Sequence, residues 1–395
     1  MSARAPGEGA PAGGDEIAPS ARRGGRAARE GAPAGGGGGA LGGLGRWLRE
    51  EGETYVLGLT RLGFGLLLLS ASMTLFREAR RGFFRDHFHL SFLPEALLPS
   101  APVYRALLGA HLLLALWVVA GWRARPALGL ASLVGLYLLL CDRLEYHNNR
   151  YALYCYAFLL SFAPCDRAFA LGAPRDPSAR RGPLWAQRLV QAQASLVYLA
   201  SSLTKLADPD WRGGVMLGDR AARFLERRRL GWPVDPFLEW FAQPHVASPF
   251  SKLVIATELF LALGLWAPRA RAVALWVGLF FHVTIEVTQQ VQLFSYTTLT
   301  VYLLFAAPAT RERALEVPPA RAKLGERLRL LDWLARFEVR PAAEGAPLAA
   351  VDRDGRRATG FGAFVVLCRA LPLLFPLWLP LAALERARAL ARRPA

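Results

Sequence analysis

Eight apolar runs, separated by stretches rich in Arg, Pro and Gly, occupy most of the chain between residues 54 and 308. A helix needs about 20 apolar residues to cross the hydrocarbon core of a membrane, and shorter runs can be accommodated by neighbouring helices. The runs cover residues 54–76, 103–122, 126–142, 150–166, 185–205, 251–267, 270–288 and 291–308. Because helices satisfy their own backbone hydrogen bonds in lipid, this pattern predicts an all-α fold: a polytopic membrane bundle of about eight transmembrane helices.

The two ends of the chain differ in composition from these runs. Residues 1–45 are dominated by Gly, Ala, Pro and Arg, which predicts a disordered tail because such a segment buries too little apolar surface to fold. Residues 46–310 form the predicted membrane domain. Residues 311–395 are more polar and predict a small C-terminal extramembrane region. Prolines and Arg369 interrupt its last apolar stretch, 359–384, so we expect packed or interfacial helices there rather than a ninth span.

The basic residues indicate how the predicted spans are oriented. The formal net charge is +17, and much of it lies in the connections between apolar runs, so we expect these side chains to face anionic lipid headgroups rather than nucleic acid. With a cytoplasmic N-terminus, the connections after the second, fourth and sixth runs are cytoplasmic and rich in Arg, as the positive-inside rule requires. The opposite connections at 77–102 and 206–250 also carry Arg, although the second is long and therefore counts less. We predict a multi-pass protein with its N-terminus in the cytoplasm.

The four cysteines do not indicate a metal or redox site. The chain has Cys141, Cys155, Cys165 and Cys368. These four residues form no C-x-x-C pair, and three of them lie in or beside apolar runs. We expect them to be small buried side chains, and we expect no metal.

The run 185–205 carries polar side chains on one helical face. Their spacings of three or four residues match the helical repeat. They are Gln187, Gln191, Ser195, Tyr198, Ser202 and Lys205. Such a stripe must face protein or water, because lipid cannot satisfy its hydrogen bonds. Contacts between helices explain the Gln and Ser residues, whereas Lys205 is either a cation that reaches the headgroups or a functional group.

The residue type at position 205 bears on that choice. Only three lysines, Lys205, Lys252 and Lys323, are found among the 48 basic residues of the chain. A cation that only has to reach the headgroups could be an arginine, as it is almost everywhere else in this sequence. A proton acceptor could not, because arginine stays charged at accessible pH, whereas burial can lower the pKa of a lysine. The lysine therefore favours a base.

Other ionisable residues in apolar runs suggest further contacts. His282 and Glu286 lie one helical turn apart, a spacing that allows a side-chain pair, a proton relay or two metal ligands, and we favour a hydrogen bond that shapes a site. Glu258 and Arg61 have opposite charges, and charged groups within a membrane tend to pair.

A further group of polar residues, His147, Asn148, Asn149 and Arg150, gathers where the fourth run begins. It is either a polar cap at the membrane edge or part of a site.

Four segments, in this order, resemble the HTTM family, the bacterial relatives of vitamin K-dependent gamma-glutamyl carboxylase. They are "YHNNRYALYCYAFLLSFAPCDR", "YLASSLTKLADPDWRGG", "TELFLALGLW" and "FFHVTIEVTQQVQLFSYTTLTVYLLF". The resemblance covers roughly residues 47–310. Its most specific element is K-L-x-x-x-D-W-x-x-G at residues 205–214, followed by N-N-R-Y-A-L at residues 148–153.

The resemblance implies a site. The lysine of the first element is taken in that family as the base that deprotonates a reduced quinone, so Lys205 is the implied catalytic residue. Asn149 matches the asparagine of the second element, whereas the family's following histidine is Arg150 here, and His147 is the nearest substitute. The implied cofactor is a reduced naphthoquinone of the vitamin K or menaquinol type. The expected substrate-binding residues are His147, Asn149, Tyr198, Ser202 and His282.

The resemblance also implies a function, a quinol oxygenase or epoxidase in a bacterial inner membrane with lipids and a quinone as partners. The chain lacks the length for the large lumenal domain that holds the peptide in the human-type carboxylase, so a protein substrate is not expected. Residues 311–395 weakly resemble the tail of a DCC-type thiol-oxidoreductase domain, without its D-x-x-C-x-x-C motif, and are expected to be redox-inactive. The alternative is a non-catalytic lipid- or quinone-binding membrane protein, or a subunit of a membrane complex.

Overall fold

The computed structural model describes residues 40–81, 90–174, 176, 178–227, 229–289, 293–306 and 311–391, most of which are helical. Contacts divide the chain into a unit Met1–Gly43 and a unit Leu44–Ala395. Most of the predicted disordered tail, residues 1–39, lies outside the described residues. Helix α1 (Ala40–Arg49) begins inside the range predicted to be disordered, so order starts before the predicted boundary at residue 45.

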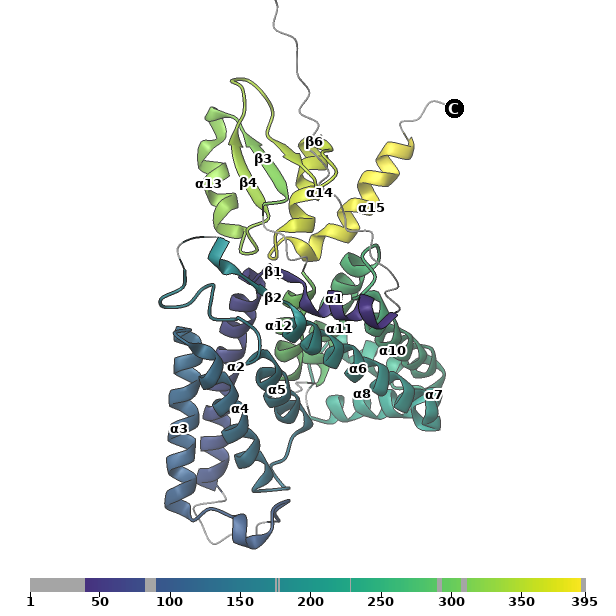
Figure 1. The fold of residues 1–395 in the computed structure, drawn as a ribbon. Coiled ribbons are helices and arrows are strands. Elements are labelled where there is room, and N and C mark those ends of the chain that lie inside the picture. The colour runs from purple at the N-terminus through teal and green to yellow at the C-terminus, as the bar shows by residue number, and fades with distance from the viewer. Residues whose placement is uncertain are drawn as a thin grey trace, which may run out of the picture. The chain divides into compact units, whose positions relative to one another are not determined.

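A helix covers most of each of the eight apolar runs (Figure 1). These helices are α2 (Tyr55–Arg81), α3 (Ala101–Ala120), α4 (Ala124–Leu140), α5 (Asn148–Leu160), α6 (Trp185–Ala207), α10 (Pro244–Gly264), α11 (Arg271–Gln289) and α12 (Phe294–Phe305). Within the described ranges, three of them, α2, α3 and α10, are long and apolar enough to cross a membrane by length and composition. The helical prediction therefore holds, whereas the predicted number of eight spans is not confirmed.

The ends of α3 illustrate how the sequence sets helix boundaries. Ser100 precedes the helix in an extended conformation and Pro102 occupies its first turn, where no backbone N–H is needed. Gly121 ends it with a φ of 85°, a left-handed conformation that suits glycine, and donates its backbone N–H to the carbonyl of Trp117.

The helices pack around one large apolar core. α2 and α4 pack against α3, α5 packs against α4, and α6 packs against α10. α12 contacts both α2 and α6. Leu57, Phe64 and Leu68 of α2 are fully buried in this core together with Leu153 of α5 and Val190 of α6. The packing places the polar face of α6 against α10, α11 and α12.

The long connection after α6 is helical as well. It contains α7 (Pro209–Gly213), α8 (Val215–Arg227) and α9 (Val234–Phe241). Single 3-10 turns lie at Glu95–Leu97, Ser178–Arg180 and Pro319–Arg321.

The all-α prediction was wrong in two places, because the chain forms two small sheets. β1 (Glu51–Glu53) pairs antiparallel with β2 (Arg181–Pro183) beside the start of α2. The C-terminal region contains a four-stranded sheet in the order β4-β3-β5-β6. Its strands are β3 (Arg313–Val317), β4 (Phe337–Pro341), β5 (Ala349–Val351) and β6 (Arg357–Thr359). Strands of three to five residues are too short to show an alternating pattern and depend on distant partners.

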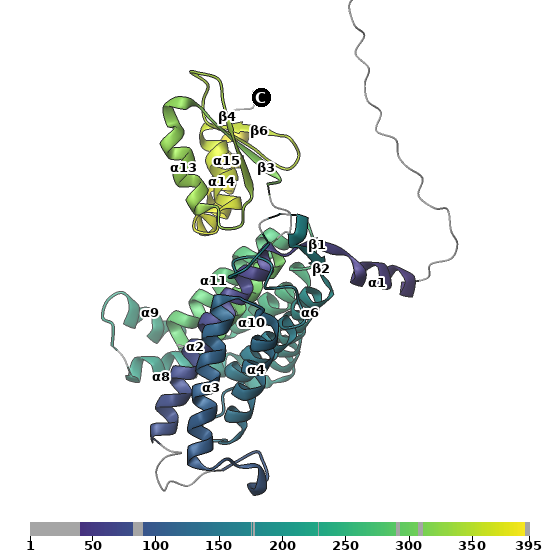
Figure 2. The same cartoon turned by 60° about the vertical axis from the view of Figure 1, so that its left-hand side comes forward.

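The C-terminal sheet is a βαβ unit followed by a hairpin and a helix. β3 and β4 are parallel and are connected through α13 (Ala322–Leu331), whereas β5 and β6 are antiparallel to their neighbours. α13 and α14 (Gly360–Ala370) lie beside the sheet in Figures 1 and 2 and enclose a small core with it. In thioredoxin-like βαβ units the first helix starts with C-x-x-C, whereas here the residues after β3 are Pro318–Arg321.

The apolar stretch 359–384 is divided, as its prolines predicted. α14 ends at Ala370, and α15 (Phe375–Ala391) begins after a turn that contains Pro372. α14 packs against β5, β6 and α15. The indole N–H of Trp276 in α11 donates to the carbonyl of Pro376, 2.9 Å away, and so ties α15 to the membrane domain.

Candidate functional site

Lys205 lies in the last turn of α6, where a cation interacts favourably with the helix dipole. The helix ends at Ala207 because Asp208 precedes Pro209, and a residue before proline is disfavoured in the helical conformation. Asp208 instead caps α7, accepting a hydrogen bond from the backbone N–H of Asp210 at 2.9 Å. The carboxylate of Asp208 is therefore used to cap the start of α7.

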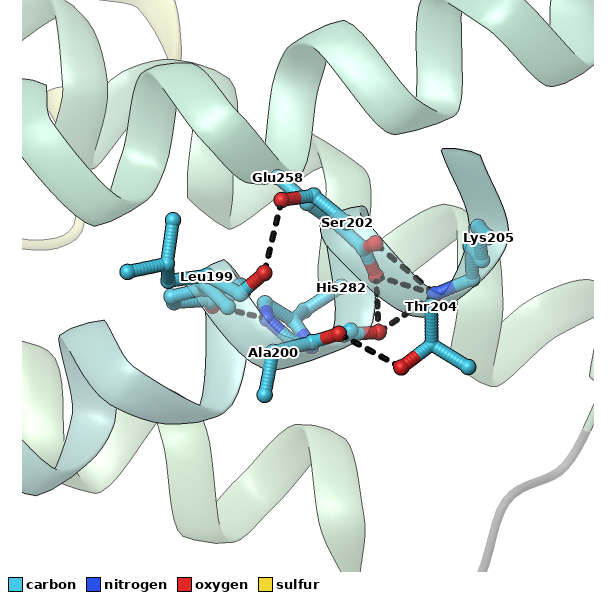
Figure 3. A network of polar contacts seen from close by, with 9 residues as sticks. Leu199, Ala200, Ser202, Thr204, Lys205, Glu258 and His282 are labelled. Carbon is cyan, nitrogen blue, oxygen red and sulfur yellow. Dashed lines mark hydrogen bonds and ion pairs between the residues drawn. The ribbon is translucent and has the colours of Figure 1, made fainter. Parts of the chain in front are cut away.

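The amine of Lys205 is held by Glu258 of α10 (Figure 3). Its Nζ donates to Oε1 of Glu258 at 2.7 Å, to Oε2 at 2.8 Å, and to the hydroxyl of Ser201 at 2.5 Å. Ser201 donates in turn to Oε1 of Glu258 at 3.0 Å. The Lys205 side chain is 16% exposed and that of Glu258 8%, so the ion pair is largely removed from water. Nζ also lies 5.0 Å from the centre of the Trp211 ring, within range of a cation–π contact.

The predicted pairing of Glu258 with Arg61 was wrong. Arg61 is fully buried and donates to the backbone carbonyls of Val118 at 2.6 Å and Val119 at 3.1 Å, and to that of Phe169. The last carbonyls of a helix have no partner inside it, and Arg61 satisfies them at the end of α3. Opposite charge alone did not identify the partner of Glu258.

A second buried cluster joins α6, α11 and α12. The hydroxyl of Tyr198 lies 2.5 Å from Nε2 of His282 and 2.6 Å from the hydroxyl of Tyr302. Among the described residues, Nδ1 of His282 and Oε2 of Glu286 are buried without a hydrogen-bond partner. The predicted His282–Glu286 hydrogen bond is therefore not formed, and the imidazole bonds to Tyr198 instead.

The two clusters belong to one polar region. Tyr198 lies two helical turns before Lys205 on α6, and its hydroxyl interacts electrostatically with Glu258. Figure 3 shows His282 and Glu258 beside the segment of α6 that carries Lys205. The region combines an ion pair, three hydroxyls and an imidazole, groups that can bind oxygen atoms and move protons.

The rest of the predicted stripe faces protein, as expected. Gln187 and Gln191 donate to the carbonyl of Leu304 in α12 at 2.9 and 2.8 Å. Ser195 accepts from the indole N–H of Trp266 at 2.7 Å. Ser202, expected in the substrate site, donates to the carbonyl of Leu199 on its own helix at 2.9 Å.

Ser201, which the predicted stripe omitted, contacts both charges of the ion pair. It lies four residues before Lys205, so the i, i+4 neighbour rule could have identified it.

The residues around the start of α5 form a separate group. Arg150 is fully buried and makes two hydrogen bonds to the carboxylate of Glu78, one of them 2.5 Å long from Nη1 to Oε2. His147 and Asn149 are half-buried at the first turn, and partial burial, followed by the charge of Arg150, lowers the pKa of His147. Within the described ranges, no hydrogen bond connects either residue to the Lys205 cluster, so their substrate-binding role stays a prediction.

The Glu78–Arg150 pair lines a cavity of ≈ 40 Å³, enough for water molecules but not for a quinone ring. Tyr104, Asp142 and Glu145 also line it. Burial, followed by the charge of Glu78, raises the pKa of Glu145. Sequence reasoning missed Glu78, although it is the first acid after the apolar run 54–76.

The cysteines and potential metal ligands are dispersed. All four cysteines are free thiols; Cys141, Cys165 and Cys368 are buried and Cys155 is half-buried. Across the residues that the structure describes, no group of three or more His, Cys, Asp or Glu side chains is arranged to hold a metal ion.

Comparison with known proteins assigns the membrane region to a family. The family model described as HTTM domain matches residues 50–309. No match is found among curated proteins or among solved structures. The matched range covers more than half of the chain, runs from the strand before α2 to the end of α12, and includes the Lys205–Glu258 pair and the Tyr198–His282–Tyr302 cluster. The chain therefore belongs to the HTTM domain family.

Proposed function

We propose that this protein is a membrane-embedded quinol-oxidising enzyme, an oxygenase or epoxidase of the type found in vitamin K-dependent carboxylase, in which Lys205 and Glu258 accept the substrate proton. The observation that carries the proposal is the Lys205–Glu258 pair, which is largely buried at the end of a polar helical face. Ionisable groups are costly in a membrane and tend to be functional there. The resemblance of the element at residues 205–214 to the one that carries the base in the carboxylase family supports the same assignment.

The ion pair can accept a proton in two steps. Glu258 first takes a proton from the Lys205 ammonium, which gives a neutral carboxylic acid beside a neutral amine; a low dielectric reduces the cost of this exchange. The Lys205 amine then accepts the proton of an acidic hydroxyl and becomes an ammonium again. The pair gains one proton in total, and the substrate is left with one negative charge. The short Nζ–Oε distances of 2.7 and 2.8 Å suit the first transfer.

The polar region has buried hydrogen-bonding atoms that are free to bind a quinol. In the described part of the chain, His282 Nδ1 and Glu286 Oε2 are buried without partners, and Tyr198 lies between His282 and Tyr302. These groups fit the hydroxyl or carbonyl oxygens of a ring, and we expect His147, Asn149 and Ser202 to complete the site when it is occupied. A reduced naphthoquinone would supply the acidic hydroxyl and the electrons that dioxygen takes.

Competitive amine labelling tests whether a quinone occupies this site. Lys205 should react with an amine reagent more slowly than Lys252 and Lys323, because its amine is mostly buried and bonded to Glu258 and Ser201, whereas the other two are exposed. A naphthoquinone analogue should slow the labelling of Lys205 further, and mass spectrometry measures all three rates in one sample. If the analogue leaves the labelling rate of Lys205 unchanged, the quinone site is not at the ion pair, and a non-catalytic membrane protein becomes the favoured function.

We also propose a multi-pass arrangement in a bacterial inner membrane with a cytoplasmic N-terminus, from the distribution of Arg among the connections. Reporter fusions at residues 40, 178 and 320 should report the cytoplasm, and a fusion at residue 215 the periplasm. A cytoplasmic signal at 215 would reverse the orientation and place Lys205 at the other face of the membrane.

A further inference from the structure

Four arginines meet at one end of the C-terminal sheet. Arg313 starts β3 and Arg336 directly precedes β4, and because these strands are parallel both lie at the same end. Arg353 lies in the turn between β5 and β6, at that end too because β5 is antiparallel to β3. Arg369 lies near the end of α14, which follows β6. We call these four residues the arginine cluster.

The acidic partners of the cluster are already engaged. Nε of Arg313 donates to Oδ1 of Asp352 at 2.7 Å, and Arg369 lies 3.8 Å from the other oxygen of the same carboxylate. Arg353 is paired with Glu312. Two carboxylates therefore form ion pairs with three of the four arginines.

Arg336 is left without such a partner. It is 6% exposed, yet within the described ranges its guanidinium makes no hydrogen bond and no ion pair. Burial, followed by the positive charges of Arg313 and Arg353, lowers the pKa of Arg336 to about 10, and the charges of Glu312 and Asp332 offset this only in part. A buried cation that is repelled by its neighbours is costly unless an anion reaches it.

We propose that the arginine cluster binds a phosphate group, with Arg336 as its central ligand. A guanidinium presents a planar fork of N–H donors that matches two phosphate oxygens at once, and several of them together suit a phosphate better than a single carboxylate. The site is separate from Lys205 and does not depend on quinol oxidation.

The position of the cluster favours a phospholipid headgroup as the source of the phosphate. Arg313 follows the end of α12 at Phe305 by eight residues, a distance of at most about 28 Å along an extended chain. Asp332, at the end of α13, interacts electrostatically with the hydroxyl of Tyr55 at the start of α2. The same end of the small domain therefore lies beside the end of a helix that is long and apolar enough to cross a membrane. Free phosphate offers the same chemistry and is the other source to be tested.

The test compares Arg336→Gln with Arg340→Gln in the full-length protein. Arg340 has a side chain that is 58% exposed and is paired with Glu338, so its replacement makes the same charge change in the same domain without touching the cluster. The proteins are purified in dodecyl maltoside, and thermal unfolding is recorded while either phosphatidylglycerol or inorganic phosphate is added. The wild type and Arg340→Gln should be stabilised, whereas Arg336→Gln should need about tenfold more of the same additive.

The pattern of the response identifies the source of the phosphate. Stabilisation by phosphatidylglycerol alone assigns a lipid headgroup, and stabilisation by inorganic phosphate as well assigns a free phosphate. Without either additive, Arg336→Gln should unfold at a temperature no lower than the wild type, because the substitution removes like-charge repulsion; this separates loss of binding from misfolding. The proposal is overturned if the wild type responds to neither additive, or if both variants respond as the wild type does.

Discussion

Lys205→Arg is expected to lower the rate of quinol oxidation by at least about a hundredfold while leaving the protein folded. The guanidinium can still pair with Glu258, which accepts hydrogen bonds on both of its oxygens, so the fold retains its buried ion pair. It cannot give up a proton at accessible pH, so the pair can no longer exchange its charges and accept one from the substrate. Single-turnover oxidation of a reduced naphthoquinone by the reconstituted protein measures the rate.

Two controls accompany this variant. Lys252→Arg makes the same chemical change at an exposed position and should leave the rate unchanged. Glu258→Gln should also be slow, because glutamine cannot take the Lys205 proton. A rate in Lys205→Arg within a factor of about three of the wild type would show that only the charge matters at this position and that general-base catalysis plays no part.

Arg150→Met is expected to lower the free energy of unfolding by about 3–5 kcal/mol, because it leaves the Glu78 carboxylate without its cation in a largely buried position. Arg150 is fully buried and bonds to both oxygens of Glu78, so little solvent can replace it. Adding Glu78→Leu to Arg150→Met should recover most of the loss, since the uncompensated charge is then removed. Reversible unfolding in mixed micelles gives the free energies.

The matched control is Arg188→Met at the Arg188–Glu50 pair, whose acid is 56% exposed. Solvent can stabilise the charge of Glu50 when Arg188 is removed, so the loss in the free energy of unfolding should be about 1 kcal/mol or less. An equal loss at both positions would mean that the burial of the Glu78–Arg150 pair contributes nothing specific to stability.

The helices and the position of Lys205 at the end of a polar helical face were predictable from the sequence because both depend on local patterns. Each apolar run is long enough to form a helix whatever its neighbours are, and a helix covers most of every run. Lys205 was selected as the candidate base by its residue type and by its place at the end of a polar face, which are properties of a single segment, and its role as a base stays a prediction. Its neighbour Ser201 follows from the same helical spacing.

The partners of these residues were not predictable, because they come from distant segments. Glu258 lies 53 positions after Lys205, and only the packing of α10 on α6 brings the two together. Glu78 reaches Arg150 from a helix 72 positions earlier. The C-terminal sheet was not predicted for a related reason. Its short strands are stabilised by pairing with strands from other parts of the sequence rather than by their own composition.

The central claim, that this protein oxidises a quinol with dioxygen through the Lys205–Glu258 pair, is tested most directly by oxygen consumption. Purified wild-type protein in lipid nanodiscs is mixed with a reduced naphthoquinone, and dissolved oxygen is recorded against empty nanodiscs and against Lys205→Arg in the same lipid. The account predicts that the wild type consumes oxygen faster than both, and that the variant matches the empty nanodiscs. Equal consumption in all three samples, with the wild type shown to be folded, would contradict it.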